Sequence, residues 1–231
     1  MSVLSISEQF YTNFIKEQRY KWLLEGLGNT LLITLLAVII GIIIGFLVAI
    51  VRSSHDKTGS FKVLNGIFKV YLTIIRGTPT MIQLLIMNFV IFGSFNMNPI
   101  LVGGLAFGIN SGAYVAEIVR SGIMSVDQGQ FEAGRSLGLN YSQTMKSIIM
   151  PQAFKNVLPA LVNEMIVLLK ETSIVGYIGM MDLTKGAMLI QSRTYSAFWP
   201  LLAAALIYLI LVMILTACMN KLERKLRTNE R

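Results

Sequence analysis

The sequence predicts an all-helical integral membrane protein with five transmembrane spans, because charged residues are scarce and apolar residues form long runs. Only 14% of the 231 residues are charged, whereas 54% are hydrophobic. A soluble domain carries about a quarter charged residues. No charged residue occurs from Leu27 to Val51 or from Leu201 to Asn220, and about 20 apolar residues are needed for a helix to cross the hydrocarbon core. These two runs are therefore expected to lie in the first and last spans.

Three less pure apolar segments lie between these runs. We expect one transmembrane domain over residues 1–231, with spans at about 27–51, 63–93, 100–124, 157–177 and 198–220. The second span contains Arg76-Gly77-Thr78-Pro79 near its middle. Because proline lacks a backbone donor and disfavours helical geometry in the preceding residue, a kink or break is predicted there.

The distribution of basic residues predicts the orientation of these spans. Thirteen of them fall in or beside one set of alternate segments: Arg52, Lys57, Lys62, Lys69, Arg120, Arg135, Lys146, Lys155, Lys221, Arg224, Lys225, Arg227 and Arg231. The other set holds five: Lys16, Arg19, Lys21, Lys185 and Arg193. Since cytoplasmic loops carry the excess of Lys and Arg, the amino terminus is expected outside and the carboxy terminus in the cytoplasm.

The same distribution excludes other classes of protein. The net charge is +8, but the basic residues lie in short loops beside apolar runs, with no dense basic patch containing stacking aromatic residues. We therefore expect no nucleic-acid partner. Cys218 is the single cysteine and His55 the single histidine, so no intramolecular disulfide and no Cys- or His-rich metal site is expected.

The polar stretch from Ser125 to Met150 predicts two short helices at the cytoplasmic face. Asp127 is a suitable N-cap for a helix running through Glu132 to Leu137, and Gly138 provides a left-handed stop. A second helix is expected to begin near Asn140 or Ser142. By physical chemistry alone, this stretch is either a docking surface for a soluble partner or an amphipathic segment lying on the membrane.

A resemblance distinguishes these alternatives. Glu132-Ala133-Gly134, followed by Gly138 and then by Ile148-Ile149-Met150-Pro151, resembles the signature loop of permeases of ATP-binding-cassette importers. Gly134 and Met150 depart from the family pattern, which has alanine and leucine there, and Gly134 is expected to loosen the helix by up to about 1 kcal/mol.

Further segments resemble the polar amino acid branch of these permeases. They are Arg76 to Pro79, Ser111 to Ile123, Pro151 to Phe154, Leu158 to Glu164 and Lys170 to Ser173. Together they extend the resemblance over about residues 22–220. It implies a multi-pass protein of the bacterial cytoplasmic membrane that imports polar amino acids.

The resemblance also implies partners that supply energy and solute. The chain has no glycine loop followed by Lys and Ser or Thr for binding phosphate, so we expect it to be no enzyme and to hold no cofactor. ATP and Mg are expected on a partner ATPase dimer, and the other implied partners are an extracytoplasmic solute-binding protein, a second permease subunit and the lipid bilayer. Contact with the ATPase is assigned to Glu132, Ala133, Gly134, Gly138 and Leu139.

Polar residues inside the expected spans are the candidates for binding solute, since charges at that depth persist only when they are paired or face water. The candidates are Glu164, Asn110, Asn163, Tyr114 and Arg76. Asn110, Tyr114 and Glu117 are expected to form one stripe on the third span. Structural roles stay open: Arg76 could neutralise a buried carboxylate, Glu164 among them, and Glu117 could pair with Arg120.

Other functions are weaker alternatives. A secondary transporter or channel would need no ATPase, but such proteins usually contain inverted repeats, which this sequence lacks. A structural subunit paired with an active permease stays open, because homodimeric and heterodimeric permeases of this branch have similar sequences. An intramembrane enzyme is disfavoured because no nucleophile and base, and no metal ligands, occur together in the spans.

Overall fold

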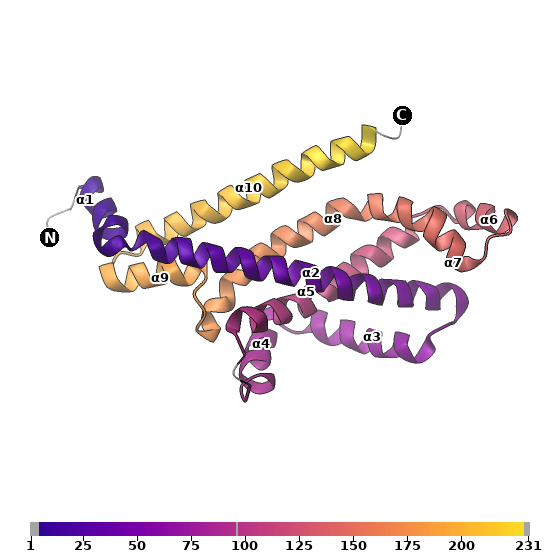
Figure 1. Ribbon diagram of the computed structural model, residues 1–231, viewed down its shortest axis with the longest axis horizontal. Coiled ribbons are helices and arrows are strands. Elements are labelled where there is room, and N and C mark those ends of the chain that lie inside the picture. Colours follow the sequence, from indigo (N-terminus) through magenta and orange to yellow (C-terminus); the bar gives the residue numbers. More distant parts are fainter. Residues whose placement is uncertain (1–4, 96, 229–231) are drawn as a thin grey trace. The chain divides into compact units, whose positions relative to one another are not determined.

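The computed structural model describes residues 5–95 and 97–228, which form helices and connecting turns with no strand among them (Figure 1). In chain order the elements are α1 (Ile6–Phe10), η1 (Tyr11–Ile15), η2 (Lys16–Gln18), α2 (Tyr20–Thr58), α3 (Lys62–Gly77), α4 (Thr80–Leu85), η3 (Ile86–Ile91), α5 (Pro99–Met124), α6 (Gln128–Ser136), α7 (Tyr141–Thr144), η4 (Met145–Ile149), α8 (Met150–Glu171), η5 (Thr172–Ile178), α9 (Leu183–Thr194) and α10 (Phe198–Thr228). The all-helical class expected from the sequence is confirmed.

Three helices in the described part of the chain are long and apolar enough to cross a membrane: α2, α5 and α10. A fourth span results if the broken pair of α3 with α4 and η3 is counted as one. The break lies where the sequence predicts it, because Thr78 has extended backbone geometry immediately before Pro79. Helix α8, the fourth expected span, does not belong to this group, and it carries Lys155, Glu164, Lys170 and Glu171.

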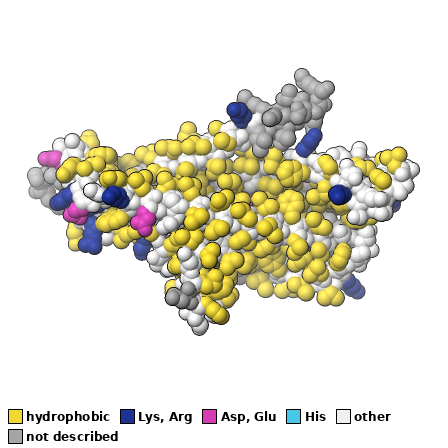
Figure 2. All heavy atoms as spheres, viewed as in Figure 1, with side chains coloured by type: hydrophobic (Ala, Val, Ile, Leu, Met, Phe, Trp, Pro, Cys, Tyr) yellow, Lys and Arg dark blue, Asp and Glu magenta, His cyan; other side chains and the backbone are white. Residues whose placement is uncertain are grey.

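Apolar side chains cover much of the visible surface of the protein (Figure 2). Large hydrophobic residues of α2 and α10 are exposed in particular, including Leu35, Ile43, Leu206 and Ile214. Such side chains are stable on a surface when the surrounding solvent is lipid. The basic residues counted from Arg224 onward lie beyond the residues whose side chains are described.

The chain divides into two compact units, and the division falls within α2, α5, α8 and α10. Unit 1 comprises residues 1–37, 80–107 and 166–217. Its core contains Phe14, Leu23, Leu183, Ala187 and Ile190, with Trp22 and Trp199 packed against it. Gly26 and Gly186 lie so close to the backbone of the facing segment that a Cβ atom at either position would collide with it. The absence of a side chain at these two glycines therefore allows the close approach.

Unit 2 comprises residues 38–79, 108–165 and 218–231. Within it, α2 and α5 pack closely through small residues: a Cβ atom on Gly41 would lie 3.1 Å from the Cβ of Ser111, and one on Gly112 would lie 2.9 Å from the Cβ of Ile44. Small residues allow such approaches in membranes, where lipid supplies no hydrophobic drive between helices. The core of Ala49, Val119 and Ile149 then joins α2 and α5 to the segment that leads into α8.

Candidate functional site

A polar cavity of about 630 Å³ lies in unit 2 between α2, α3 and α5. Its lining consists of Arg52, Lys69, Leu72, Thr73, Arg76, Gly77, Tyr114 and Glu117. Three of these residues are cations and one is an anion. The lining therefore carries an excess of positive charge, which favours an anionic group in the cavity.

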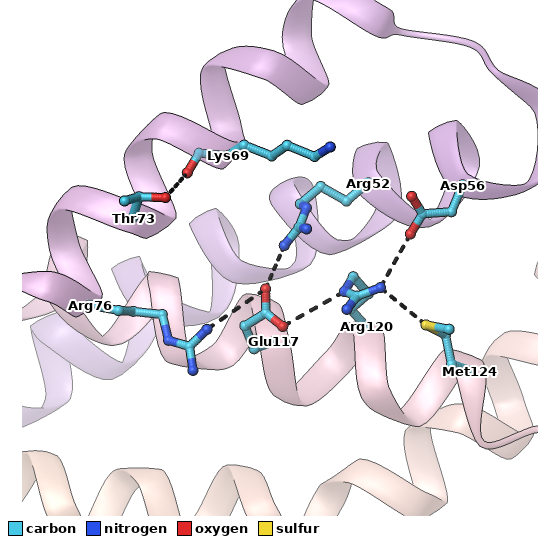
Figure 3. A network of polar contacts seen from close by, with 8 residues as sticks. All are labelled: Arg52, Asp56, Lys69, Thr73, Arg76, Glu117, Arg120 and Met124. Atoms are coloured by element: carbon cyan, nitrogen blue, oxygen red, sulfur yellow. Dashed lines mark hydrogen bonds and ion pairs between the residues drawn. The ribbon is translucent and has the colours of Figure 1, made fainter.

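Glu117 is the centre of a cluster of arginines beside this cavity (Figure 3). Its Oε1 atom lies 2.5 Å from Nη1 of Arg52 and 4.0 Å from Nη1 of Arg76. Its Oε2 atom lies 3.7 Å from Nε of Arg120, three residues along α5. Arg120 also donates to Asp56 at 3.2 Å. One carboxylate thus holds together guanidinium groups from α2, α3 and α5.

Arg76 has a second contact in the cavity. Its guanidinium carbon lies 5.8 Å from the centre of the Tyr114 ring, which is within the range of a cation–π interaction. Figure 3 shows Arg76 reaching from α3 towards Glu117 on α5. The side chain is 46% exposed, whereas that of Arg52 is 15% exposed. Arg76 is therefore the guanidinium of the cluster that is most accessible to a ligand.

Glu164 on α8 has different surroundings. Its Oε1 atom accepts a hydrogen bond of 2.9 Å from the hydroxyl of Ser111 on α5, and the side chain is half-buried. Among the described residues, no Lys, Arg or His forms an ion pair with it. Arg76, which the sequence left open as its partner, pairs with Glu117 instead.

The structure brings only part of the predicted solute-binding set together. Tyr114 and Arg76 line the cavity, and Glu164 contacts the same helix, α5, through Ser111. Asn110 is fully buried and Asn163 is exposed, and neither lines the cavity. The stripe of Asn110, Tyr114 and Glu117 is thus divided between the protein interior and the cavity.

Sequence reasoning missed Arg52, Lys69 and Ser111. Arg52 and Lys69 were counted only as basic residues that orient the spans, and Ser111 was noted only for its resemblance. Arg52 and Glu117 are 65 residues apart along the chain. No local pattern reports such a pair. The alternative pairing of Glu117 with Arg120 did follow from their spacing, and it is present.

The predicted cytoplasmic loop contains the two short helices expected from its sequence. Asp127 caps α6 by accepting a hydrogen bond of 2.6 Å from the backbone N–H of Gly129. Gly138 has φ +76°, the left-handed geometry expected of it. Asn140 and Gln143 form a reciprocal capping box at the start of α7. The local structure of this loop is therefore confirmed, while its contact with an ATPase stays a prediction.

Gly134 has a packing role that the sequence did not show. A Cβ atom at this position would lie 2.6 Å from Cγ2 and 2.7 Å from Oγ1 of Thr144. Gly134, which stands where the family pattern has alanine, thus allows α6 to lie against α7. Glu132 and Ala133 are exposed, as is Leu137, the residue at which the sequence predicts the helix to end. Leu137 follows the end of α6 as its C-cap, so its side chain escapes the packing that buries Gly134.

Within the described part of the chain, no three His, Cys, Asp or Glu residues gather as they would to hold a metal ion. The cavity lining contributes charged side chains, and the Glu164 site contributes a carboxylate that is hydrogen-bonded to Ser111.

Comparisons with known proteins bear on the same regions. Residues 37–228 match a family described as "Binding-protein-dependent transport system inner membrane component". The chain is 40% identical over 211 residues to the arginine transport system permease protein ArtQ of Bacillus subtilis (strain 168), covering 90% of this chain and 94% of the relative. It is 44% identical over 162 residues to a putative glutamine transport system permease protein GlnP of Rickettsia conorii (strain ATCC VR-613 / Malish 7), covering 69% of this chain and 74% of the relative.

Solved structures agree in fold. A chain from a structure described as an amino acid ABC transporter with histidines superposes with a TM-score of 0.83 and 41% sequence identity, covering 97% of this chain and all of that chain. A chain of the MetNI methionine ABC transporter gives a TM-score of 0.76 at 19% identity, covering 88% of this chain and 95% of that chain. The second likeness concerns the fold alone.

Proposed function

The chain belongs to the family of binding-protein-dependent transport system inner membrane components, and on that premise we propose that it carries polar amino acids along a path beside α5. It is the permease subunit of an amino acid ATP-binding-cassette transporter of the bacterial inner membrane. Relatives named for arginine and glutamine transport support a polar amino acid as the solute. The residues proposed to meet that solute are Arg76, Tyr114 and Glu164.

The observation that carries this proposal is a difference in the partners of two carboxylates. Glu117 has three guanidinium partners, whereas Glu164 has a hydroxyl group and no cation among the described residues. A carboxylate at the depth of a span needs a cation, a proton or water. An amino acid brings an ammonium group, and some bring a second cation on the side chain. Glu164 is proposed to receive one of these positive groups.

The cavity beside Glu117 is proposed to receive the carboxylate of the same solute. Its lining contains three cationic side chains, Arg52, Lys69 and Arg76, and one anionic side chain, Glu117. Of the three cations, Arg76 has a side chain that is 46% exposed. Ser111, which contacts Glu164, lies six residues before Glu117 on α5. Six residues correspond to about 9 Å along a helix, a separation that an extended amino acid with a cationic side chain can approach. Asn110 and Asn163 stay predicted contacts without a place in this cavity.

Uptake by reconstituted transport complexes tests the role of Glu164. Glu164→Gln keeps the shape of the side chain and can still accept from Ser111, but it removes the charge. We expect uptake to fall about tenfold or more, because a charge-assisted contact contributes about 1.5–3 kcal/mol, with the yield of assembled complex unchanged. Ser111→Ala is the matched control, since it removes the hydroxyl and leaves the charge. Unchanged uptake kinetics for Glu164→Gln would contradict the proposal, and a collapse in yield would assign Glu164 a structural role.

Orientation and the number of spans form a second part of the proposal. The thirteen-to-five division of basic residues supports an amino terminus outside. We count α8 as the fourth of five spans because residues 157–177 are mostly apolar and Glu164 within them contacts α5. In a Cys218→Ser background, single cysteines are introduced in place of Lys57, Met97 or Gln130. Intact cells are then treated with a thiol reagent that does not cross the membrane. Labelling is expected at position 97 alone. Labelling at position 130 from outside would reverse the orientation.

Coupling to the ATPase is the third part. We assign it to Glu132, Ala133, Gly134, Gly138 and Leu139, with ATP and Mg held by a partner ATPase dimer, solute delivered by an extracytoplasmic binding protein, and a second permease subunit completing the complex. The exposed Glu132 and Leu137 support a contact made at this end of α6. Gly138→Val places a β-branched side chain at a positive φ. Assembly is expected to persist while uptake and solute-stimulated ATP hydrolysis are lost, and full uptake by this variant would refute the assignment.

A further inference from the structure

The segment before α2 exposes an apolar face, and the one ring contact from this face among the described residues is that of Phe10 with the buried Phe14 of the same segment, at 5.1 Å between ring centres. Residues 5–19 fold into α1, η1 and η2, and Ile6, Phe10, Tyr11 and Ile15 in this segment are 45–72% exposed. From its sequence the same segment is polar and of mixed charge. It also lies before the region matched by the family, which begins at residue 37.

The opposite face of this segment is firmly attached to unit 1. Phe14 is buried in the core with Leu23 and Leu183. Asn13 accepts a hydrogen bond of 2.9 Å from the hydroxyl of Thr194, and Gln9 accepts one of 2.5 Å from the indole of Trp199. The segment is therefore an ordered part of the unit, and its apolar residues are held outward by these contacts.

Aromatic residues surround the segment on the same unit. Both tryptophans of the chain, Trp22 and Trp199, pack against the core that contains Phe14. Tyr20 lies two residues before Trp22, and the exposed Tyr195 and Phe198 lie four residues and one residue before Trp199. Trp and Tyr concentrate where a membrane protein crosses from hydrocarbon to headgroups. This end of unit 1 thus has the composition of a membrane interface.

The apolar face continues into surfaces that the membrane must cover. In the unit 1 part of α2, Leu24, Leu31 and Leu35 are exposed, and in that of α10, Leu201 and Leu209 are exposed. Within residues 5–19 the charges balance: Glu8 and Glu17 oppose Lys16 and Arg19, and Arg19 is buried in an ion pair with Glu17 at 3.0 Å. Attraction of a charged protein partner to this segment is therefore weak, whereas apolar contact is available.

We propose that Ile6, Phe10, Tyr11 and Ile15 insert into the lipid interface on the side of the membrane where the amino terminus lies, so that residues 5–19 anchor unit 1 against lipid headgroups. An interfacial helix of this kind buries its apolar face about 5–10 Å into the boundary between headgroups and acyl chains. The proposal is independent of which side of the membrane is outside and of which solute is carried.

Depth-dependent fluorescence quenching in the full transport complex tests this proposal. A bimane label is placed at position 10 by Phe10→Cys in a Cys218→Ser background, and the complex is reconstituted into vesicles of phosphatidylethanolamine and phosphatidylglycerol. Glu8→Cys on the same segment is the matched control, because Glu8 is exposed and polar. Lipids brominated on their acyl chains are expected to quench the label at position 10 and to leave position 8 sensitive to aqueous iodide. If the Phe10 variant does not assemble, Ile6→Cys provides the same measurement at the most exposed of the four residues.

Two results would overturn the proposal. Quenching by iodide, without quenching by brominated lipid, at positions 10 and 6 would place the face in water. Protection of these labels from iodide only after the soluble binding protein is added would identify a docking surface for that protein instead. Uptake measured on the same vesicles separates this outcome from any failure of the solute path, because the labelled positions lie outside it.

Discussion

Glu117 and Glu164 lie in the unit 2 parts of α5 and α8, which are joined by the hydrogen bond between Ser111 and Glu164, yet the surroundings of the two carboxylates differ in charge. Arg52, Arg76 and Arg120 surround Glu117. Glu164 receives a hydrogen bond from Ser111 and has no cation among the described residues. The first carboxylate is neutralised by the protein itself, so its charge serves the packing of three helices. The second leaves a charge that a ligand can satisfy.

This difference in partners distinguishes Glu117 from Glu164, the carboxylate proposed to bind solute, more clearly than their positions in the spans do. Both residues lie in expected spans and both are acidic, so the rule that intramembrane charges are functional applies to both. The partners decide between the roles. Substitutions that remove one partner at a time therefore test whether the two carboxylates have different roles.

The largest effect is expected from Glu117→Ala. Removing one partner of a buried ion pair costs about 3–5 kcal/mol because the remaining charge stays uncompensated. The Glu117 side chain is 27% exposed, so we expect a loss near the lower end, about 3 kcal/mol. Thermal unfolding in detergent and the yield of complex would measure it. Glu164→Ala is the comparison variant, and an equal loss of stability in the two would show that both carboxylates are structural.

An intermediate effect is expected when Arg52 or Arg76 is replaced by glutamine. Arg52→Gln removes the guanidinium nearest to Glu117, at 2.5 Å and mostly buried, whereas Arg76→Gln removes one at 4.0 Å that is more exposed. We expect Arg52→Gln to lower the free energy of unfolding by about 2 kcal/mol more than Arg76→Gln, because removing one partner of a buried ion pair costs more than removing one partner of an exposed pair. Arg76→Gln is expected to raise the solute concentration needed for half-maximal uptake while leaving yield intact. Equal effects of both variants on yield, with no change in uptake, would remove Arg76 from the solute path.

The smallest effect concerns a third carboxylate, Asp182 of unit 1, which is held by backbone N–H groups. It caps α9 by accepting from Lys185 at 2.9 Å and from Thr184 at 3.3 Å. Burial raises the pKa of Asp182, although these hydrogen bonds lower it. The folded state therefore binds the proton of the Asp182 carboxyl group more tightly than the unfolded state does. The stability that this protonation contributes is present below the ordinary pKa of 3.8 and is lost as pH rises through the raised pKa.

Thermal unfolding measured from pH 4 upward would detect this loss as a modest decrease in melting temperature. Asp182→Asn retains an oxygen that can cap the helix and cannot titrate, so the decrease is expected to disappear in that variant. An unchanged pH dependence in Asp182→Asn would assign the decrease to other groups.

Local properties of the sequence were sufficient for the class of fold and for several details. Hydrophobic runs report burial in lipid because every backbone group there must be paired within a helix. The break before Pro79, the cap at Asp127 and the left-handed Gly138 each depend on one residue and its immediate neighbours. The order of motifs also identified the family, which the match over residues 37–228 confirms.

Tertiary structure decided which charges meet. The pairing of Arg52 with Glu117 joins residues 65 positions apart, and that of Ser111 with Glu164 joins residues 53 apart. Both depend on how each helix is rotated about its axis and where it crosses its neighbour, which periodicity alone leaves open. For the same reason the sequence showed Gly134 as a weak point of a helix, and only the approach of Thr144 showed why glycine is needed. The apolar face of residues 5–19 likewise became visible once Phe14 and Asn13 were fixed against α9, because exposure is a property of packing.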